Sequence, residues 1–258
     1  MNTFNSFKTY VKKEIIEGMR TKKFLVLAIG ILFFAVSDPI MLKLLPEILK
    51  NQMQGADLSM LIELSQKAAL DSYTNNLFQL STIIIVLSIM GIISKERSDK
   101  TLTIPVSMGC SINGMVLAKL LVYGVFILLV NVIGMLIAYY YSGIIFGFTY
   151  GSMLAAAVSG ALYGVFFLFV LSVLILASSF FKKSFLSVTT TLLFVYLMPL
   201  AGYFEILKKY LPANLLTEAN YFAELLSKNM LVSLICTISL TVIFSILSVY
   251  KLEHVEFV

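Results

Sequence analysis

Long apolar runs separated by short polar segments dominate the sequence. Uncharged apolar stretches cover Phe24–Val36, Leu77–Ile93, Ser184–Phe204 and Asn229–Tyr250. A fifth stretch, Leu120–Phe181, continues for 62 residues without Asp, Glu, Lys, Arg or His. Since one membrane span takes about 20 apolar residues, this stretch fits two spans joined by a tight turn. The pattern therefore predicts an all-α membrane protein with six spans.

The six predicted spans cover about residues 23–45, 77–94, 115–141, 152–181, 184–204 and 229–250. The uninterrupted part of the first span has 13 residues and resembles the apolar core of a signal peptide, with Ala35-Val36-Ser37 at the place of a cleavage site. The charged stretch before it is long for a signal peptide. We therefore expect an uncleaved span that passes Asp38-Pro39 and ends near Leu45, with Pro39 bending the helix.

An amphipathic helix is predicted over residues 1–22. Its apolar residues recur at steps of three and four and are Phe4, Phe7, Val11, Ile15 and Met19. The charged residues Lys12, Lys13, Glu17 and Arg20 occupy other faces. Such a helix suits the membrane–water boundary, with its apolar side toward the acyl chains and its basic side toward phosphates. The alternative is a cytoplasmic helix that packs on protein.

Two outer segments are longer than simple turns. Pro46–Asn76 contains enough leucine and isoleucine for a short amphipathic helix. Glu205–Lys228 mixes charges with aromatic and aliphatic residues that would be poor in a solvated loop. We expect short helices there that lie on the outer leaflet or dip into it.

The composition supports a membrane location. Of 258 residues, 59% are hydrophobic and 13% charged, and the mean hydropathy is +0.95. Soluble domains have about 45–50% apolar and about 25% charged residues. The difference excludes an ordinary cytosolic enzyme, a secreted disulfide scaffold and a disordered tail.

The distribution of charge predicts the orientation. With the N-terminus inside, 13 of the 19 Lys and Arg residues fall on cytoplasmic segments, and the cytoplasmic side carries +7 against −2 outside. This asymmetry follows the positive-inside rule, and it explains the net charge of +5 without a nucleic-acid partner. We expect both termini in the cytoplasm and a location in the cytoplasmic membrane of a bacterium.

Catalytic and metal-binding motifs are absent from the sequence. Gly109–Gly114 has the glycine spacing of a phosphate-binding loop, but Met115-Val116 stand where Lys and Ser or Thr would be needed. Cys110, Cys236 and His254 do not form a metal-ligand pattern. We expect no catalytic residue, no bound metal and no cofactor held by this chain.

The predicted spans contain almost no ionisable residues. Asp38 is the one carboxylate close to a span, and it lies near an interface. Carriers driven by protons or sodium normally keep buried charged residues as relays. The pattern argues against a self-powered carrier, although sodium could still bind backbone carbonyls at a broken helix.

Uncharged polar residues and glycines in the spans allow two interpretations. The hydroxyl groups, for example those of Ser233, Thr237 and Thr241, could bond helix to helix or line a transport pathway. The glycines repeat at four residues in two groups, Gly143, Gly147 and Gly151, and Gly160 and Gly164. This spacing lets helices approach closely, within one chain or between two.

The segment between the second and third spans, Ser94–Gly114, is unusually rich in charge. Ser98 is placed to cap a short helix whose first turn holds Asp99, and Pro105 disfavours helix at Ile104. We expect a small helix on the cytoplasmic surface. It is either a solvated connector or a docking element for a cytoplasmic partner.

This segment carries a resemblance to a known family. Glu96-Arg97, Thr101-Leu102, Pro105-Val106-Ser107 and Lys119 occur in that order. The order resembles the first cytoplasmic loop of type-2 ABC exporter permeases, where Glu-Arg/Lys-x-x-Gly-Thr-Leu precedes Pro-Val-Ser and a Lys opens the third span. The chain departs from the pattern at Lys100, where Gly is usual, and at Thr103-Ile104, where leucines are common.

The resemblance implies partners as well as a fold. Such permeases have an N-terminal interfacial (elbow) helix, a coupling helix in this loop, and short re-entrant outer helices between spans five and six. Two permeases pair with two ATPase subunits, and the loop helix rests in a groove of the ATPase, which binds ATP and Mg²⁺. The residues so assigned to ATPase coupling are Lys95, Glu96, Arg97, Asp99, Lys100, Thr101, Leu102 and Pro105.

We therefore expect a non-catalytic permease subunit of an ATP-driven exporter, forming a single transmembrane domain and working as a homo- or heterodimer. Its apolar, Met- and Phe-rich spans suit an amphipathic or hydrophobic cargo, a peptide before a drug, a lipid or sodium. The alternatives are a self-standing secondary carrier or channel, and a membrane-embedded enzyme or a non-transporting immunity or assembly protein.

Overall fold

The computed structural model describes residues 3–52, 63–204, 208–224 and 227–254, and these ranges contain helices and connections but no strand. Five of the described helices are long and apolar enough to cross a membrane. They are α2 (Lys23–Gln52), α7 (Ile112–Phe146), α8 (Met153–Phe180), α9 (Ser184–Leu197) with the 3-10 turn η3 (Met198–Tyr203), and α12 (Lys228–Glu253). The expected all-α class and the multi-pass membrane character are therefore supported.

The second predicted span is not one regular helix. Three consecutive elements cover it: α3 (Gln66–Asn76), the π-helical turn η2 (Leu77–Ser81) and α4 (Thr82–Ser88). The helical stretch thus begins 11 residues earlier than predicted and ends before the predicted limit at residue 94. The short helix expected in Pro46–Asn76 is α3, while Leu58, Leu61 and Ile62 of its predicted apolar residues lie outside the described residues.

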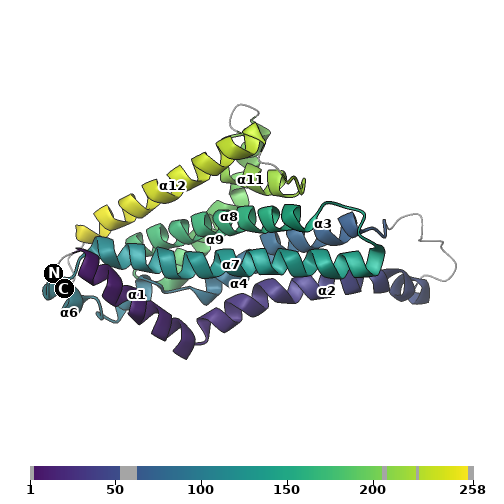
Figure 1. Cartoon of the computed structure of the whole chain (residues 1–258). Coiled ribbons are helices and arrows are strands. Elements are labelled where there is room, and N and C mark those ends of the chain that lie inside the picture. The colour runs from purple at the N-terminus through teal and green to yellow at the C-terminus, as the bar shows by residue number, and fades with distance from the viewer. Residues whose placement is uncertain (1–2, 53–62, 205–207, 225–226, 255–258) are drawn as a thin grey trace.

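Helix α2 is longer than predicted and continues through Pro39 and Pro46. Its Asp38 side chain is buried and accepts a hydrogen bond from Asn76 Nδ2 of α3 at 2.9 Å. The carboxylate therefore joins two helices. We expected a bend at Pro39, and Figure 1 shows that the axis of α2 changes direction toward its C-terminal end.

Helix α8 lies at the centre of the bundle and is the most buried of the five long helices, with α7 packed along it (Figure 1). Gly160 and Gly164 allow this contact. A Cβ at Gly160 would lie 2.8 Å from Val132 Cα, and one at Gly164 would lie 2.8 Å from Leu128 Cα. This glycine pair therefore packs helices within the chain. The other group differs, because Gly147 and Gly151 have positive φ in the α7–α8 connection.

We expect Gly160→Ala to destabilise the protein by about 1–3 kcal/mol, because the neighbouring atoms are backbone atoms that cannot turn aside. The matched control is Gly202→Ala, where an added Cβ meets nothing within 4 Å. Unfolding of the purified variants in detergent micelles measures the difference. Equal stability of the two variants would contradict the close α7–α8 contact.

The hydroxyl groups of the spans mostly bond backbone carbonyls. In α12, Thr237, Thr241 and Ser245 each donate to the carbonyl four residues earlier, at 2.7–2.8 Å. Two others cross between helices, Ser81 to Gly30 O at 2.9 Å and Ser248 to Ile175 O at 3.3 Å. These groups therefore satisfy their hydrogen bonds inside the fold.

The start of α1 (Thr3–Arg20) and the end of α12 lie at the same end of the bundle, together with α6 (Thr103–Ser107), as Figure 1 shows. We refer to this as the termini end and to the opposite one as the far end. The segment predicted to carry short outer helices, 205–228, holds one described helix, α11 (Pro212–Ala219).

Candidate functional site

The charged segment between α4 and α7 forms two short helices, not one. They are α5 (Ser94–Ser98) and α6 (Thr103–Ser107), and Lys100 between them has a φ of 55°. The predicted cap was wrong, because Ser98 ends α5 and its hydroxyl donates to Asp99 Oδ1 at 3.0 Å. Ile104 is helical after all, since Pro105 lies in the first turn of α6, where proline is tolerated.

A buried ion-pair network lies beneath these helices and is the strongest candidate for a functional site. Lys119 of α7 is 1% exposed, and its Nζ lies 2.7 Å from Glu14 Oε1 of α1 and 3.0 Å from Glu96 Oε2 of α5. Glu14 is also 1% exposed and Glu96 is 14% exposed. One lysine therefore joins α7 to α5 and to α1, which is distant from both in sequence.

Three further side chains extend the network toward solvent. Lys13 Nζ lies 3.1 Å from Glu14 Oε1 and 3.4 Å from Glu17 Oε2, and it also contacts Glu96 Oε1. Lys23, at the start of α2, pairs with Glu17 Oε1 at 2.8 Å. Among the described residues, the network thus balances three carboxylates against three ammonium groups across α1, α2, α5 and α7.

The network changes the acidity of its outer members. Partial burial opposes ionisation of Glu17, but the Lys23 and Lys13 ammonium groups outweigh it and hold the pKa of that carboxyl below its ordinary value. Burial likewise disfavours the charged form of Lys13, but Glu96 and Glu14 raise its pKa above the ordinary value. Both groups therefore stay charged at neutral pH.

The sequence of α1 explains how Glu14 reaches this position. Ser6, Tyr10, Glu14 and Gly18 recur every four residues and form the buried face of the helix. At its start this face meets Gly114 of α7, where a Cβ would lie 2.8 Å from Thr3 O. The Ser6 hydroxyl accepts a hydrogen bond from the Ser111 backbone N–H at 3.1 Å. Small residues thus bring α1 close enough for Glu14 to reach Lys119.

A second set of contacts ties α5 to the central helix. Arg97 Nη1 donates to the carbonyls of Ser178 and Ser179 at 3.2 and 2.5 Å, in the last turn of α8. A cation at a helix C-terminus satisfies carbonyls that have no partner within the helix. Ser94 Oγ also lies 2.8 Å from Ser187 Oγ of α9. Helix α5 is therefore held on opposite sides by α1 with α7 and by α8 with α9.

The predicted coupling residues fall into two groups. Glu96, Arg97 and Leu102 face inward, and Leu102 is 2% exposed. The residues Lys95, Asp99, Lys100 and Thr101 are exposed, and Pro105 is half-buried. The structure therefore brings only part of the predicted set onto one surface, and it assigns Glu96 and Arg97 to anchoring contacts.

The predicted membrane-interface residues divide as well. Phe4, Ile15 and Met19 are exposed, whereas Phe7 and Val11 are partly buried against the core. Helix α1 therefore packs on protein along one face while it presents apolar side chains along another. The packing on protein is confirmed for one face, and the membrane-interface role of the other face stays a prediction.

An apolar groove separates α1 from α6 at the termini end. It has a volume of about 400 Å³ and is lined by residues that include Tyr10, Ile104 and Met108. Ile104 is 68% and Met108 76% exposed. These two side chains form the apolar tip of α6, next to the charged network that closes one wall of the groove through Lys13 and Glu96.

The three carboxylates of the network lie within 4.8 Å of one another, a spacing that could suit a cation. The ammonium groups of Lys119 and Lys13 already lie against them. Since each carboxylate is paired with an ammonium, the arrangement fits an ion-pair network better than a metal site.

Sequence reasoning missed Glu14, Lys13, Glu17 and Lys23 as site residues and treated Lys119 only as part of a motif. The signal that could have identified Glu14 is its place between Tyr10 and Gly18 on a face of mostly small and polar residues. A carboxylate on such a face lies against protein and needs a partner.

Comparison of the chain with family models, curated proteins and solved structures gives no match.

Proposed function

We propose that this protein is the membrane-spanning permease subunit of an ATP-driven exporter, which takes its energy from a separate ATPase. The observation that carries the proposal is the network of Glu14, Glu96 and Lys119. It ties a surface segment, α5–α6, directly to the third span and to the N-terminal helix. A force applied to that segment would therefore reach the bundle through buried charges.

Six crossings fit the arrangement better than five. Both termini lie at one end, and a chain that begins and ends on one side of a membrane crosses it an even number of times. The α3–η2–α4 stretch supplies the additional crossing, since its 23 helical residues span about 35 Å at 1.5 Å per residue. The apolar core of a bilayer is about 30 Å thick.

In the proposed mechanism, closure of the ATPase pair pushes on α6. Helix α5 passes the displacement to α7 through Glu96 and Lys119, and to α8 through Arg97. Because α7 and α8 pack at glycine contacts along their length, they move as one unit. The exposed apolar side chains of Phe4, Ile15 and Met19 keep α1 in the membrane interface while this happens.

In this proposal, the ATPase docks on the tip of α6 and on the groove beside it. Ile104 and Met108 would insert into a pocket of the partner, and the exposed charges of Lys95, Asp99 and Lys100 would form the rim. The termini end then faces the cytoplasm, in agreement with the excess of basic residues assigned to that side. The cargo class we favour is an amphipathic or hydrophobic peptide, moved between two permeases.

If ATP is hydrolysed by a separate subunit, an ATPase should co-purify with this chain from its native host, and the chain alone should have no ATPase activity. Mass spectrometry of the affinity-purified complex and phosphate release by the isolated subunit provide the two measurements. Appreciable ATP turnover by the isolated subunit would overturn the proposal. So would cargo flux in liposomes that contain this chain alone, which is what a self-standing carrier or channel predicts.

A further inference from the structure

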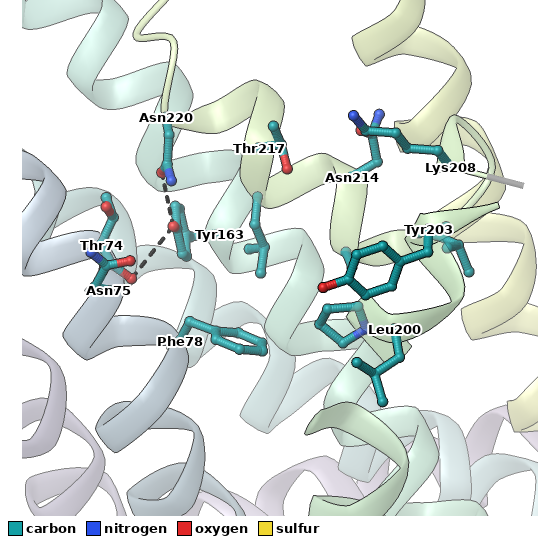
Figure 2. Close-up of a pocket in the computed structure, with 15 residues that line it drawn as sticks. Thr74, Asn75, Phe78, Tyr163, Leu200, Tyr203, Lys208, Asn214, Thr217 and Asn220 are labelled. Atoms are coloured by element: carbon teal, nitrogen blue, oxygen red, sulfur yellow. Dashed lines mark hydrogen bonds between the residues drawn. The ribbon is translucent and has the colours of Figure 1, made fainter. Parts of the chain in front are cut away.

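A second cavity lies away from the ion-pair network, between η2, α8, η3 and α11 (Figure 2). Its volume is about 500 Å³ and it is partly open. Cavities of this size accept small organic molecules. One wall comes from the π-helical turn η2, an irregularity that is rare and often found at functional sites.

The lining divides into an apolar part and a polar part. Phe78, Pro199, Leu200, Leu211 and Leu216 contribute apolar surface. The side chains of Asn75, Lys208 and Thr217 contribute N–H and O–H donors. Figure 2 shows Lys208 and Tyr203 on one side of the cavity, Asn75 on the other side next to Tyr163, and Thr217 between them. No Asp or Glu of the described residues lines the cavity. Its polar part therefore favours an anion.

The polar groups deep in the cavity are already satisfied, whereas those at the rim are available. The Tyr163 hydroxyl donates to Asn220 Oδ1 at 2.9 Å, and Asn214 Nδ2 donates to Ser233 Oγ at 2.9 Å. Asn75 and Thr217 are exposed and make no side-chain hydrogen bond within the described part of the chain. Lys208 likewise has no carboxylate partner among the described residues, so its ammonium group can meet a ligand.

The surroundings of the cavity are those of a membrane boundary. Tyr203 is 84% exposed and Tyr210 is 45% exposed, and tyrosines gather where the acyl chains meet the head groups. Leu200 and Phe204 beside them are also exposed apolar side chains. A molecule that reaches this site therefore meets an apolar region and a polar region together.

We propose that this cavity binds an amphiphile with an anionic, phosphate-type head group. Lys208 and Thr217 would hold the anionic oxygens, and Phe78, Leu200 and Leu211 would cover the apolar part. Charge-assisted hydrogen bonds to phosphate are the strong ones of their kind. The assignment does not depend on the proposed ATPase, because it concerns the isolated chain.

The absence of tryptophan from the sequence allows a direct test. Tyr203→Trp places the only indole at the cavity, and Tyr140→Trp, at a 58% exposed site on α7 that does not line it, provides a reference. Each variant is reconstituted in phosphatidylcholine vesicles with a small fraction of lipid brominated on its acyl chains. The brominated lipid is either phosphatidylglycerol or phosphatidylcholine.

We expect the indole at position 203 to report about a fivefold enrichment of the anionic lipid over the zwitterionic one, the ratio that one basic residue provides near a membrane surface. Lys208→Gln should remove the preference and Lys208→Arg should keep it. Lys209→Gln is the matched control, because the Lys209 ammonium lies 4.8 Å from the centre of the Tyr210 ring and does not line the cavity.

Four results would overturn the assignment. The first is equal quenching at position 203 by the two lipids, and the second is an unchanged preference in Lys208→Gln. The third is displacement of brominated phosphatidylglycerol by soluble glycerol phosphate, which would show that the anion alone binds and that the apolar wall contributes nothing. An equally strong preference at position 140 would likewise show a general property of the bilayer surface.

Discussion

Replacing Lys119 with methionine should destabilise the protein by about 3–5 kcal/mol, the usual cost of breaking a buried ion pair by removing one partner. The methylene stem is kept, but Glu14 loses the cation 2.7 Å from its Oε1 atom and Glu96 loses the one 3.0 Å from its Oε2 atom. The loss is large because Glu14 is almost fully removed from water. Thermal or denaturant unfolding in detergent micelles measures it.

Two variants separate this effect from a general change in charge. Lys12→Met removes an exposed lysine of α1 and should change the stability by less than about 0.5 kcal/mol. Glu14→Gln in the Lys119→Met background removes a buried carboxylate that has lost a partner and should recover part of the lost stability. A Lys119→Met protein as stable as Lys12→Met would show that the network does not hold α1, α5 and α7 together.

Placing a carboxylate on the tip of α6 is expected to weaken coupling to the proposed ATPase partner while the membrane fold stays intact. Ile104→Asp and Met108→Asp change side chains that are 68% and 76% exposed, so neither change disturbs the core. If these side chains enter a pocket of the partner, each variant should weaken the association by about thirtyfold or more, the effect of losing an interface hot spot.

The readouts are the affinity of the proposed ATPase partner for this chain in liposomes and the cargo flux that ATP hydrolysis supports. Ile104→Leu is the conservative control and should retain both. Undiminished association and flux in both aspartate variants would reduce α6 to a connector. Glu96 is a weaker place for this test, because its carboxylate belongs to the ion-pair network and its replacement would also destabilise the protein.

The two experiments address separate links between sequence and activity. The Lys119 variants test whether the buried charges hold α1, α5 and α7 together. The α6 variants test whether the force enters from a partner. If Lys119→Met loses stability but the α6 variants keep their flux, the network is structural and its proposed role in coupling is contradicted.

The sequence predicted the long helices well because their signal is local. Observed bounds such as Met153–Phe180 and Lys228–Glu253 lie within a few residues of the predicted ones, since an uncharged run of sufficient length can be satisfied in a membrane only by helix. The second span was predicted less well. Its α3 portion is polar, and no local pattern marks a π-helical turn at Leu77–Ser81.

The candidate site followed the sequence only in part. The charged loop stood out because its residues interrupt the apolar pattern, and Lys119 stood out as a lysine at the start of a span. Glu14 and Lys13 did not, because a helical period shows which side chains share a face but not whether that face meets water or protein. The loop sequence also gave no indication that Arg97 would donate a hydrogen bond to the end of α8.

The sequence by itself predicts a helical, multi-pass membrane protein. Long uncharged apolar runs can form all their backbone hydrogen bonds inside a bilayer when they are helical. Its charge asymmetry also predicts an orientation. Only the tertiary structure decided that a lysine of α7, a glutamate of α1 and a glutamate of α5 form one buried network. The physical reason is that burial and pairing of charges depend on tertiary contacts, such as that of Glu14 with Lys119, which lie 105 positions apart.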